Sequence, residues 1–192
     1  MDSELLKAKN TLREVVRTHM KASAPHALLS ASQRLCDQLR QQLIWTEAQS
    51  VLFFAPLASE PNLWPLLIEA LAEDKTVCLP RYISAGDEYV ACQVCDIHRD
   101  LVCGKFRIRE PAPDCPVVPL NRLDLALVPG IAFDARGGRL GRGKGFYDRL
   151  LVNVRGLKCG VAFEEQMVDT VPTGPLDIRL NCILTPTRWI ET

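Results

Sequence analysis

The sequence predicts an α/β protein, a three-layer sandwich in which helices cover a mostly parallel central sheet. Helical periodicity alternates along the chain with short apolar runs. The runs at 50–56 and 124–130 are continuous and bounded by turn residues, which is typical of strands buried on both faces. Residues 50–80 also have the pattern of a β-α-β unit, which implies a right-handed parallel crossover.

Two helices are expected before the first strand. From about residue 4 to 20, apolar residues recur at helical spacing beside a stripe of cations: Lys9, Arg13 and Arg17. The segment from Ser23 to Pro25 resembles a helix start, because proline suits the first helical position. The second helix is expected to reach about residue 43, with one apolar face formed by Leu28, Leu35, Leu39 and Leu43.

The remaining elements follow from the same patterns. Further helices are expected at about 62–73 and 144–152, and strands at 50–56, 76–80, 88–97, 124–130, 157–163 and 182–185. Residues 98–120 contain several prolines and are expected to form a loop with little regular structure. Because no repeat or low-complexity segment interrupts the pattern, we expect residues 1–192 to form a single domain.

The overall charge argues against a polyanion-binding surface. Lys and Arg number 23, Asp and Glu also number 23, and 47% of the residues are hydrophobic. A neutral chain of this composition is expected to fold and not to bind nucleic acid. Apolar runs of about 18 residues, the minimum for a membrane span, are lacking, as is a secretory signal pattern at the N-terminus. We therefore expect a cytoplasmic protein without membrane contact.

The sequence has 8 cysteines, which leaves two interpretations open. Cys92 and Cys95 have the spacing of a zinc knuckle that Cys103 and Cys115 would complete, although a second close pair is lacking. The strand pattern around Cys92 and Cys95 puts them on opposite faces, which favours ordinary buried thiols.

The segment from Pro129 to Asp148 carries the strongest chemical pattern. It lies between an expected strand and an expected helix, and it is rich in glycine: Gly130, Gly137, Gly138, Gly141, Gly143 and Gly145. The cations Arg136, Arg139, Arg142 and Lys144 lie among these glycines, and Arg149 follows. Glycines let backbone N–H groups approach an anion, and cations neutralise it. The pattern predicts a phosphate site, with a flexible solvated turn as the alternative.

Residues 138–144 match most of a Walker A loop, but Gly145 stands where a Ser or Thr would bind magnesium. A carboxylate such as Asp148 would have to supply that ligand. An ordinary nucleoside triphosphatase loop is therefore not expected.

This segment, PGIAFDARGGRLGRGKGFYD, resembles the signature of the 5-formyltetrahydrofolate cyclo-ligase family. Other family features occur in order along the chain: Lys9-xx-Leu12-Arg13, Glu60, Leu79-Pro80-Arg81-Tyr82, Ile108-Arg-Glu110-Pro111, Val171-Pro172, Asp177 and Thr185-Pro186. The resemblance implies a NagB/RpiA/CoA-transferase-like fold. It also implies an enzyme that uses ATP and Mg²⁺ to convert 5-formyltetrahydrofolate into 5,10-methenyltetrahydrofolate, and we expect a monomer.

The resemblance also implies roles for individual residues. Arg142 and Lys144 would be catalytic. The ATP-binding residues would be Lys9, Arg13, Arg139, Leu140, Gly141, Arg142, Gly143, Lys144, Gly145, Phe146 and Tyr147. The folate-binding residues would be Glu60, Tyr82, Phe106, Arg142, Gly143, Lys144, Gly145 and Phe146. Asp148 would bind the metal, and Asn181 stands where some family members have a second metal-binding Asp. Either Asp148 and phosphate oxygens would hold Mg²⁺, or Asp177 would contribute as a second ligand.

Each of these roles has a simpler alternative. Lys9 and Arg13 fit a solvated helix face, Glu60 a helix cap, and Tyr82 and Phe106 core aromatic residues. Two other functions also remain open: a phosphate-binding protein without ligase activity, and an RNA-binding module that uses the Arg/Gly segment. Zero net charge weighs against the RNA-binding module.

Overall fold

The computed structural model describes residues 3–192, apart from the side chain of Phe106. Its main sheet has seven strands in the order β11-β10-β9-β6-β1-β2-β3. Five neighbouring strands are parallel, and the edge strands β3 and β11 are antiparallel to their partners. The strands span Ser50–Leu52 (β1), Thr76–Ile83 (β2), Glu88–Gln93 (β3), Leu125–Val128 (β6), Leu157–Val161 (β9), Cys182–Leu184 (β10) and Trp189–Glu191 (β11). The predicted mostly parallel α/β fold is confirmed.

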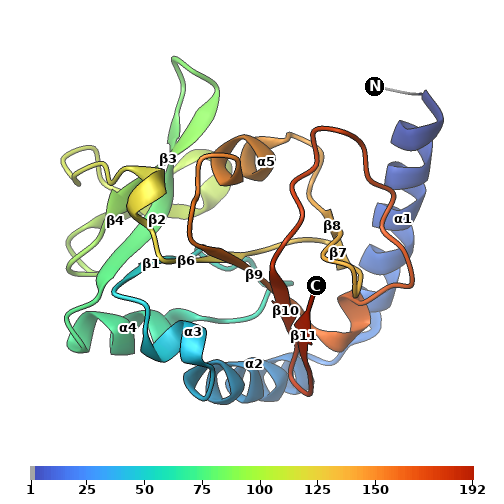
Figure 1. The fold of residues 1–192 in the computed structure, drawn as a ribbon, viewed down its shortest axis with the longest axis horizontal. Helices are drawn as coiled ribbons and strands as arrows, with labels where there is room; N and C mark the ends of the chain where they lie inside the picture. The colour runs from blue at the N-terminus through green and yellow to red at the C-terminus, as the bar shows by residue number, and fades with distance from the viewer. Residues whose placement is uncertain (1–2) are drawn as a thin grey trace.

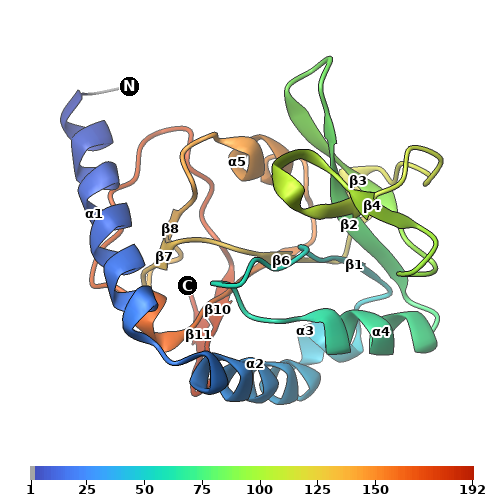
Figure 2. The same ribbon diagram turned by 180° about the vertical axis from the view of Figure 1, so that it is seen from behind.

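Helices lie on both sides of this sheet (Figure 1). One face is covered by α2 (Pro25–Arg40), α3 (Leu43–Thr46) and α4 (Trp64–Ala72), and the other by α5 (Phe146–Leu151). The long helix α1 (Ser3–Ala22) runs beside a small hairpin of β7 (Ala132–Phe133) and β8 (Arg139–Leu140), as both views show (Figure 2). The first helix thus reaches the glycine-rich segment.

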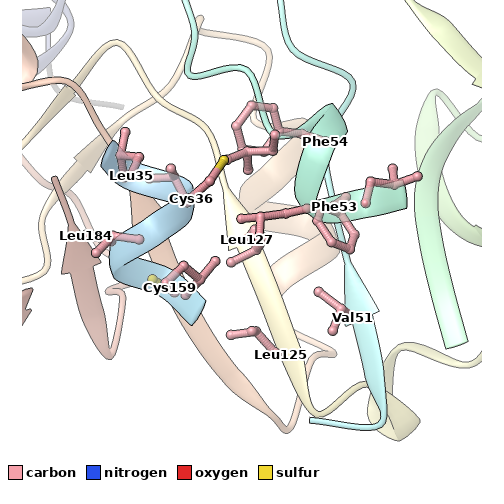
Figure 3. Close-up of a cluster of buried hydrophobic side chains, with 14 of the residues drawn as sticks. Leu35, Cys36, Val51, Phe53, Phe54, Leu125, Leu127, Cys159 and Leu184 are labelled. Carbon is pink, nitrogen blue, oxygen red and sulfur yellow. The ribbon is translucent and has the colours of Figure 1, made fainter. Parts of the chain in front are cut away.

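The core is divided by the sheet, because successive strand residues point to opposite faces. Val51 and Leu127 pack with Leu35 and Cys36 of α2 in the larger cluster (Figure 3). The next residues along the same strands, Leu52 and Val128, face α5 in the smaller cluster. This burial on both sides explains why the strand sequences are continuously apolar.

The connections of β1 and β6 determine where a ligand site is expected. The chain leaves β1 for β2 on one side, and it leaves β6 for β9 on the other, although β1 and β6 are neighbours. Such a reversal is a topological switch point, and α/β proteins usually bind ligands beside the carboxyl ends of the strands there. The loops that follow these two strands contain Glu60 and the glycine-rich segment.

Some elements differ from the expectation. The second helix ends at Arg40, and Leu43 is 72% exposed in α3, so it does not belong to the apolar face of α2. The segment expected to be mostly loop contains a hairpin, β4 (Leu101–Cys103) with β5 (Arg109–Pro111), and short 3-10 turns at Lys105–Arg107 and Leu120–Arg122. A further 3-10 turn lies at Glu164–Gln166, and β11 was not predicted from the sequence.

The cysteines divide as the strand pattern predicts. Cys92 is buried in β3, whereas Cys95 is exposed. Burial raises the pKa of Cys36 to about 11 and that of Cys78 to about 12, so these thiols stay protonated at neutral pH. Among residues 3–192, no three His, Cys, Asp or Glu side chains are grouped as metal ligands, so the zinc interpretation gains no support. In the same part of the chain no helix is long and apolar enough to cross a membrane.

Asp134 organises the turn between β7 and β8. Its buried carboxylate accepts backbone N–H bonds from Arg136 (2.9 Å), Gly138 (3.0 Å) and Val171 (2.8 Å). Burial alone would raise the pKa of Asp134, but the three N–H donors outweigh it and the pKa is lowered. The turn also requires a positive φ of 79° at Gly137.

The Asp134→Asn variant is expected to lose about 2 kcal/mol or more of unfolding free energy at neutral pH. The reason is that the side-chain NH₂ group of Asn would face backbone N–H groups that now donate to a carboxylate oxygen. A carboxyl whose pKa is lower in the folded state stabilises above its unfolded pKa of about 3.9. The deficit should therefore be constant near neutral pH and shrink as pH falls through the folded pKa. Urea unfolding measured between pH 3 and pH 8 checks this. Exposed Asp114→Asn is the control, and an equal loss in the control, or a pH-independent deficit, would contradict the argument.

Candidate functional site

The two loops at the switch point meet through an ion pair. Arg142 donates to Glu60 across 2.8 Å between Nη2 and Oε1. The other Glu60 oxygen accepts the backbone N–H of Leu57 at 3.0 Å, so the carboxylate is held within its own loop. Glu60 is buried, whereas about half of the Arg142 side chain remains exposed. Helix α4 begins after Leu63, so Glu60 does not cap it.

Helix α1 supplies two buried cations to the same region. Arg13 donates through Nε to the carbonyl of Gly141 at 2.9 Å, and Lys9 forms an ion pair with Asp177 at 2.7 Å to Oδ1. Both cations are less than a tenth exposed, so the alternative of a solvated helix face is wrong. Sequence positions as distant as 9, 141 and 177 are thus brought together.

Arg139 lies beneath the glycine-rich loop. Its side chain is 2% exposed and donates to Asp148 Oδ1 at 2.9 Å and to the carbonyl of Pro129 at 3.3 Å. The guanidinium also lies 5.7 Å from the ring centre of Tyr147. The side chain of Leu140 is in the core, 1% exposed. Neither side chain faces solvent, so these two residues are placed to support the loop rather than to line it.

The loop from Gly141 to Gly145 contains the exposed cations of the site. Gly143 has φ of 102° and Gly145 has φ of 66°, conformations that glycine adopts at little cost. Between them Lys144 is exposed, and among the described residues its ammonium group has no hydrogen-bond or ion-pair partner. An unpaired cation flanked by glycine N–H groups is the chemistry that an anionic ligand requires.

An aromatic wall, defined as Tyr82, Tyr89 and Phe146, borders this loop. Phe146 meets Tyr89 edge to face at 5.1 Å and Tyr82 at 5.7 Å between ring centres. Burial raises the pKa of Tyr89 to about 12, and burial together with the Glu60 carboxylate raises the pKa of Tyr147 further, so both phenols stay neutral. The expectation for Phe106 concerns a side chain outside the described part of the structure.

Glu110 of β5 supports the wall from behind. The Oε2 atom of this buried carboxyl accepts the Tyr82 backbone N–H at 3.1 Å. Glu110 thus takes the place of a neighbouring strand along the part of β2 that extends beyond β1. Its Oε1 is buried without a hydrogen-bond partner in the described chain, and burial raises the pKa of Glu110. No role was predicted for Glu110 beyond its place in a motif.

The two carboxylates predicted to bind a metal are both paired with cations, Asp148 with Arg139 and Asp177 with Lys9. Asp148 Oδ1, already paired with Arg139, lies 3.4 Å from the Ile178 backbone nitrogen, and Ile178 directly follows Asp177. Oxygen ligands of this kind suit Mg²⁺, which takes one or two carboxylates and completes its shell with water and phosphate oxygens. Asn181 instead uses its side-chain oxygen to accept the Lys158 N–H at 2.9 Å, at the start of β10.

Three contributors to the site were not predicted. Tyr89 lies opposite Tyr82 in the β2–β3 pair, and this contact could be predicted only from the register of the two strands. Asp134 stands in the sequence Asp-Ala-Arg-Gly-Gly, which is typical of a turn. The prediction treated this segment only as part of a phosphate loop and gave Asp134 no structural role. Arg149 was noted only as a nearby cation, yet it bonds to two backbone carbonyls.

The fold and this geometry define an α/β protein with a glycine-rich, cationic loop at the switch point of its sheet. The family model described as the 5-formyltetrahydrofolate cyclo-ligase family matches residues 6–186, so the chain belongs to that family. The 5-formyltetrahydrofolate cyclo-ligase of Escherichia coli K12 is 31% identical over 185 residues, covering 92% of this chain and all of that protein. The enzyme of the same name from Mycolicibacterium smegmatis is 34% identical, covering 74% of this chain and 76% of that one.

Solved structures agree with the fold. The Aquifex aeolicus 5,10-methenyltetrahydrofolate synthetase superposes with a TM-score of 0.84 at 32% identity, covering 95% of this chain and 92% of that one. A synthetase of the same name from Mycoplasma pneumoniae, at 21% identity, gives a TM-score of 0.73 over 93% of this chain and 98% of that one. The second likeness concerns the fold alone.

Proposed function

We propose that this protein converts 5-formyltetrahydrofolate into 5,10-methenyltetrahydrofolate, with ATP as co-substrate and Mg²⁺ as cofactor. The names of its relatives support the folate reaction. The observation that carries the proposal is the ion pair between Arg142 and Glu60, because it joins the glycine-rich loop to a buried carboxylate. A protein that only bound phosphate would not need that carboxylate.

The reaction needs a better leaving group than a formamide oxygen. In the proposed sequence the γ-phosphoryl group of ATP moves to the formyl oxygen, forming an imidate phosphate and ADP. The neighbouring folate nitrogen then attacks the imidate carbon, loses its proton, and closes the ring as phosphate departs with the former formyl oxygen. Phosphoryl transfer mainly requires positioning and neutralisation of charge.

The loop residues are suited to that task. Lys144 and Arg142 would neutralise the transferred phosphoryl group, and the N–H groups from Gly141 to Gly145 would bind phosphate oxygens. Arg13 would hold the loop through Gly141, to which it is already bonded. Lys9 lies beside Asp177, where it would balance the carboxylate or bind a phosphate oxygen.

The folate would lie against the aromatic wall, with Glu60 accepting N–H donors of the pterin. Asp148 and Asp177 would bind Mg²⁺, which when present neutralises phosphate charge. Arg139 would keep the Asp148 carboxylate oriented, since the guanidinium is fixed on its other side by the carbonyl of Pro129. The cytosolic location and the monomeric state expected from the sequence remain predictions.

An absorbance assay tests the proposal. Purified protein with ATP, Mg²⁺ and 5-formyltetrahydrofolate should produce the near-ultraviolet band of the methenyl product, and omitting ATP should abolish it. No ATP-dependent rise would contradict the proposed function. Nucleotide binding without product formation would instead favour a phosphate-binding protein that has lost ligase activity.

A further inference from the structure

Arg149 joins two segments that no other side chain described above connects. Its Nη1 donates to the Lys144 carbonyl at 3.1 Å, and its Nη2 donates to the Asp87 carbonyl at 2.8 Å. Lys144 belongs to the glycine-rich loop, whereas Asp87 lies in the turn between β2 and β3, the hairpin that projects from the sheet (Figure 1). One planar guanidinium therefore bridges the loop and the hairpin turn.

The loop needs such an external contact. Lys144 stands between two glycines at positive φ, and its own side chain makes no contact that would fix the backbone within the described chain. Glycine-flanked backbone is easily reoriented, because glycine has wide conformational freedom. A bond to the Lys144 carbonyl restricts the peptide that sets the direction of the Lys144 side chain.

The partner side of the bridge is also held in place. Asp87 has φ of 45°, and its carboxylate accepts the Tyr82 hydroxyl at 2.6 Å. The Arg149 guanidinium lies 5.1 Å from the ring centre of Phe146, which packs against Tyr82 and Tyr89. The Arg149 guanidinium is thus held on this side by the aromatic wall and by the β2–β3 turn.

We infer that Arg149 is a positioning residue that aims Lys144 by fixing the loop to the β2–β3 turn. This inference rests on the proposed function, because it assigns Arg149 a role in nucleotide use at the same site. We assign Arg149 a role through Lys144 rather than direct phosphate binding, because Nη1 and Nη2 each donate to a backbone carbonyl. Nη2 also lies 3.9 Å from the Asp87 carboxylate, which partly balances the charge of the guanidinium and would repel a phosphate.

The Arg149→Met variant should lower kcat/KM for ATP about 10- to 100-fold, a range typical of misplaced catalytic groups. Its melting temperature should stay within about 2 °C of wild type. Arg149→Lys should give an intermediate loss, because an ammonium lacks the planar fork that reaches both carbonyls. Arg155→Met, which removes an exposed arginine after α5, is the matched control and should retain full activity.

A double-mutant cycle separates positioning from direct binding. In a Lys144→Ala background, adding Arg149→Met should reduce kcat/KM for ATP by less than about threefold, because the group that Arg149 aims is already gone. Multiplying losses would show that Arg149 binds phosphate on its own and would overturn the inference, as would full activity of Arg149→Met. A wild-type protein without ATP-dependent product formation would contradict the proposed function instead. In that case fluorescence titration with ADP tests the inference, and equal ADP affinity of Arg149→Met and wild type would overturn it.

Discussion

The Lys144→Ala variant is expected to lower kcat for methenyl formation about 100- to 1,000-fold, with the folded state unaffected. Lys144 is exposed, and in the described chain its ammonium group makes no contact that folding would lose. In the proposed mechanism, its removal takes away a charge that neutralises the transferred phosphoryl group. Such preorganised charges are worth more in the transition state than in the ground state, so kcat should fall more than KM rises.

Measurement of this effect requires kcat and KM for ATP from the absorbance assay and a melting curve for each variant. Lys21→Ala, which removes an exposed lysine near the end of α1, is the matched control and should behave like wild type. Lys144→Arg should recover part of the activity, because it restores charge with a different reach. Full activity of Lys144→Ala would mean that the phosphate site lies elsewhere.

Arg142 allows a less direct test of the same loop. Its loss removes a cation and also leaves the buried Glu60 carboxylate without its ion-pair partner. A fall in activity after Arg142→Ala would thus combine loss of the proposed phosphate contact with displacement of Glu60, the proposed folate-binding carboxylate. Lys144 separates these effects because its ammonium group has no hydrogen-bond or ion-pair partner among the residues described.

The sequence predicted the fold well because continuous apolar strands and amphipathic helices follow directly from burial. Val51 and Leu52 face opposite helical layers, and only a strand with two buried faces demands apolar residues at both positions. The β7–β8 hairpin escaped prediction because two-residue strands have too few side chains for a period. Its turn depends on one carboxylate, Asp134, and one glycine conformation.

The sequence predicted which residues would gather near the glycine-rich loop better than it predicted how they pair. Lys9, Arg13, Glu60 and Asp177 were expected there, and the structure brings them to the glycine-rich loop or its neighbours. Their pairing could not be read from spacing, because the tertiary fold decides which cation meets which carboxylate. Arg139 illustrates this: it has the same side chain as Arg142, yet Arg139 is buried and paired with Asp148, whereas Arg142 is half exposed and paired with Glu60.

The Asp148→Asn variant is expected to raise the Mg²⁺ concentration that gives half-maximal activity about tenfold or more, since even residues that only support a metal ligand contribute 10- to 100-fold. An amide keeps an oxygen that can accept from Arg139, so the fold should persist. It lacks the negative charge that a hard divalent cation prefers. Activity measured across a Mg²⁺ titration, with ATP held saturating, gives the shift.

Two further substitutions assign the metal ligands. Asp177→Asn should also raise the Mg²⁺ requirement if this carboxylate leaves Lys9 to share the metal, and an unchanged requirement would assign Asp177 to the ion pair alone. Asn181→Asp should leave the requirement unaltered, because the Asn181 oxygen already accepts the Lys158 N–H at the start of β10. A lower Mg²⁺ requirement in Asn181→Asp, together with no change in Asp148→Asn, would move the metal from the first turn of α5 to the last parallel strand.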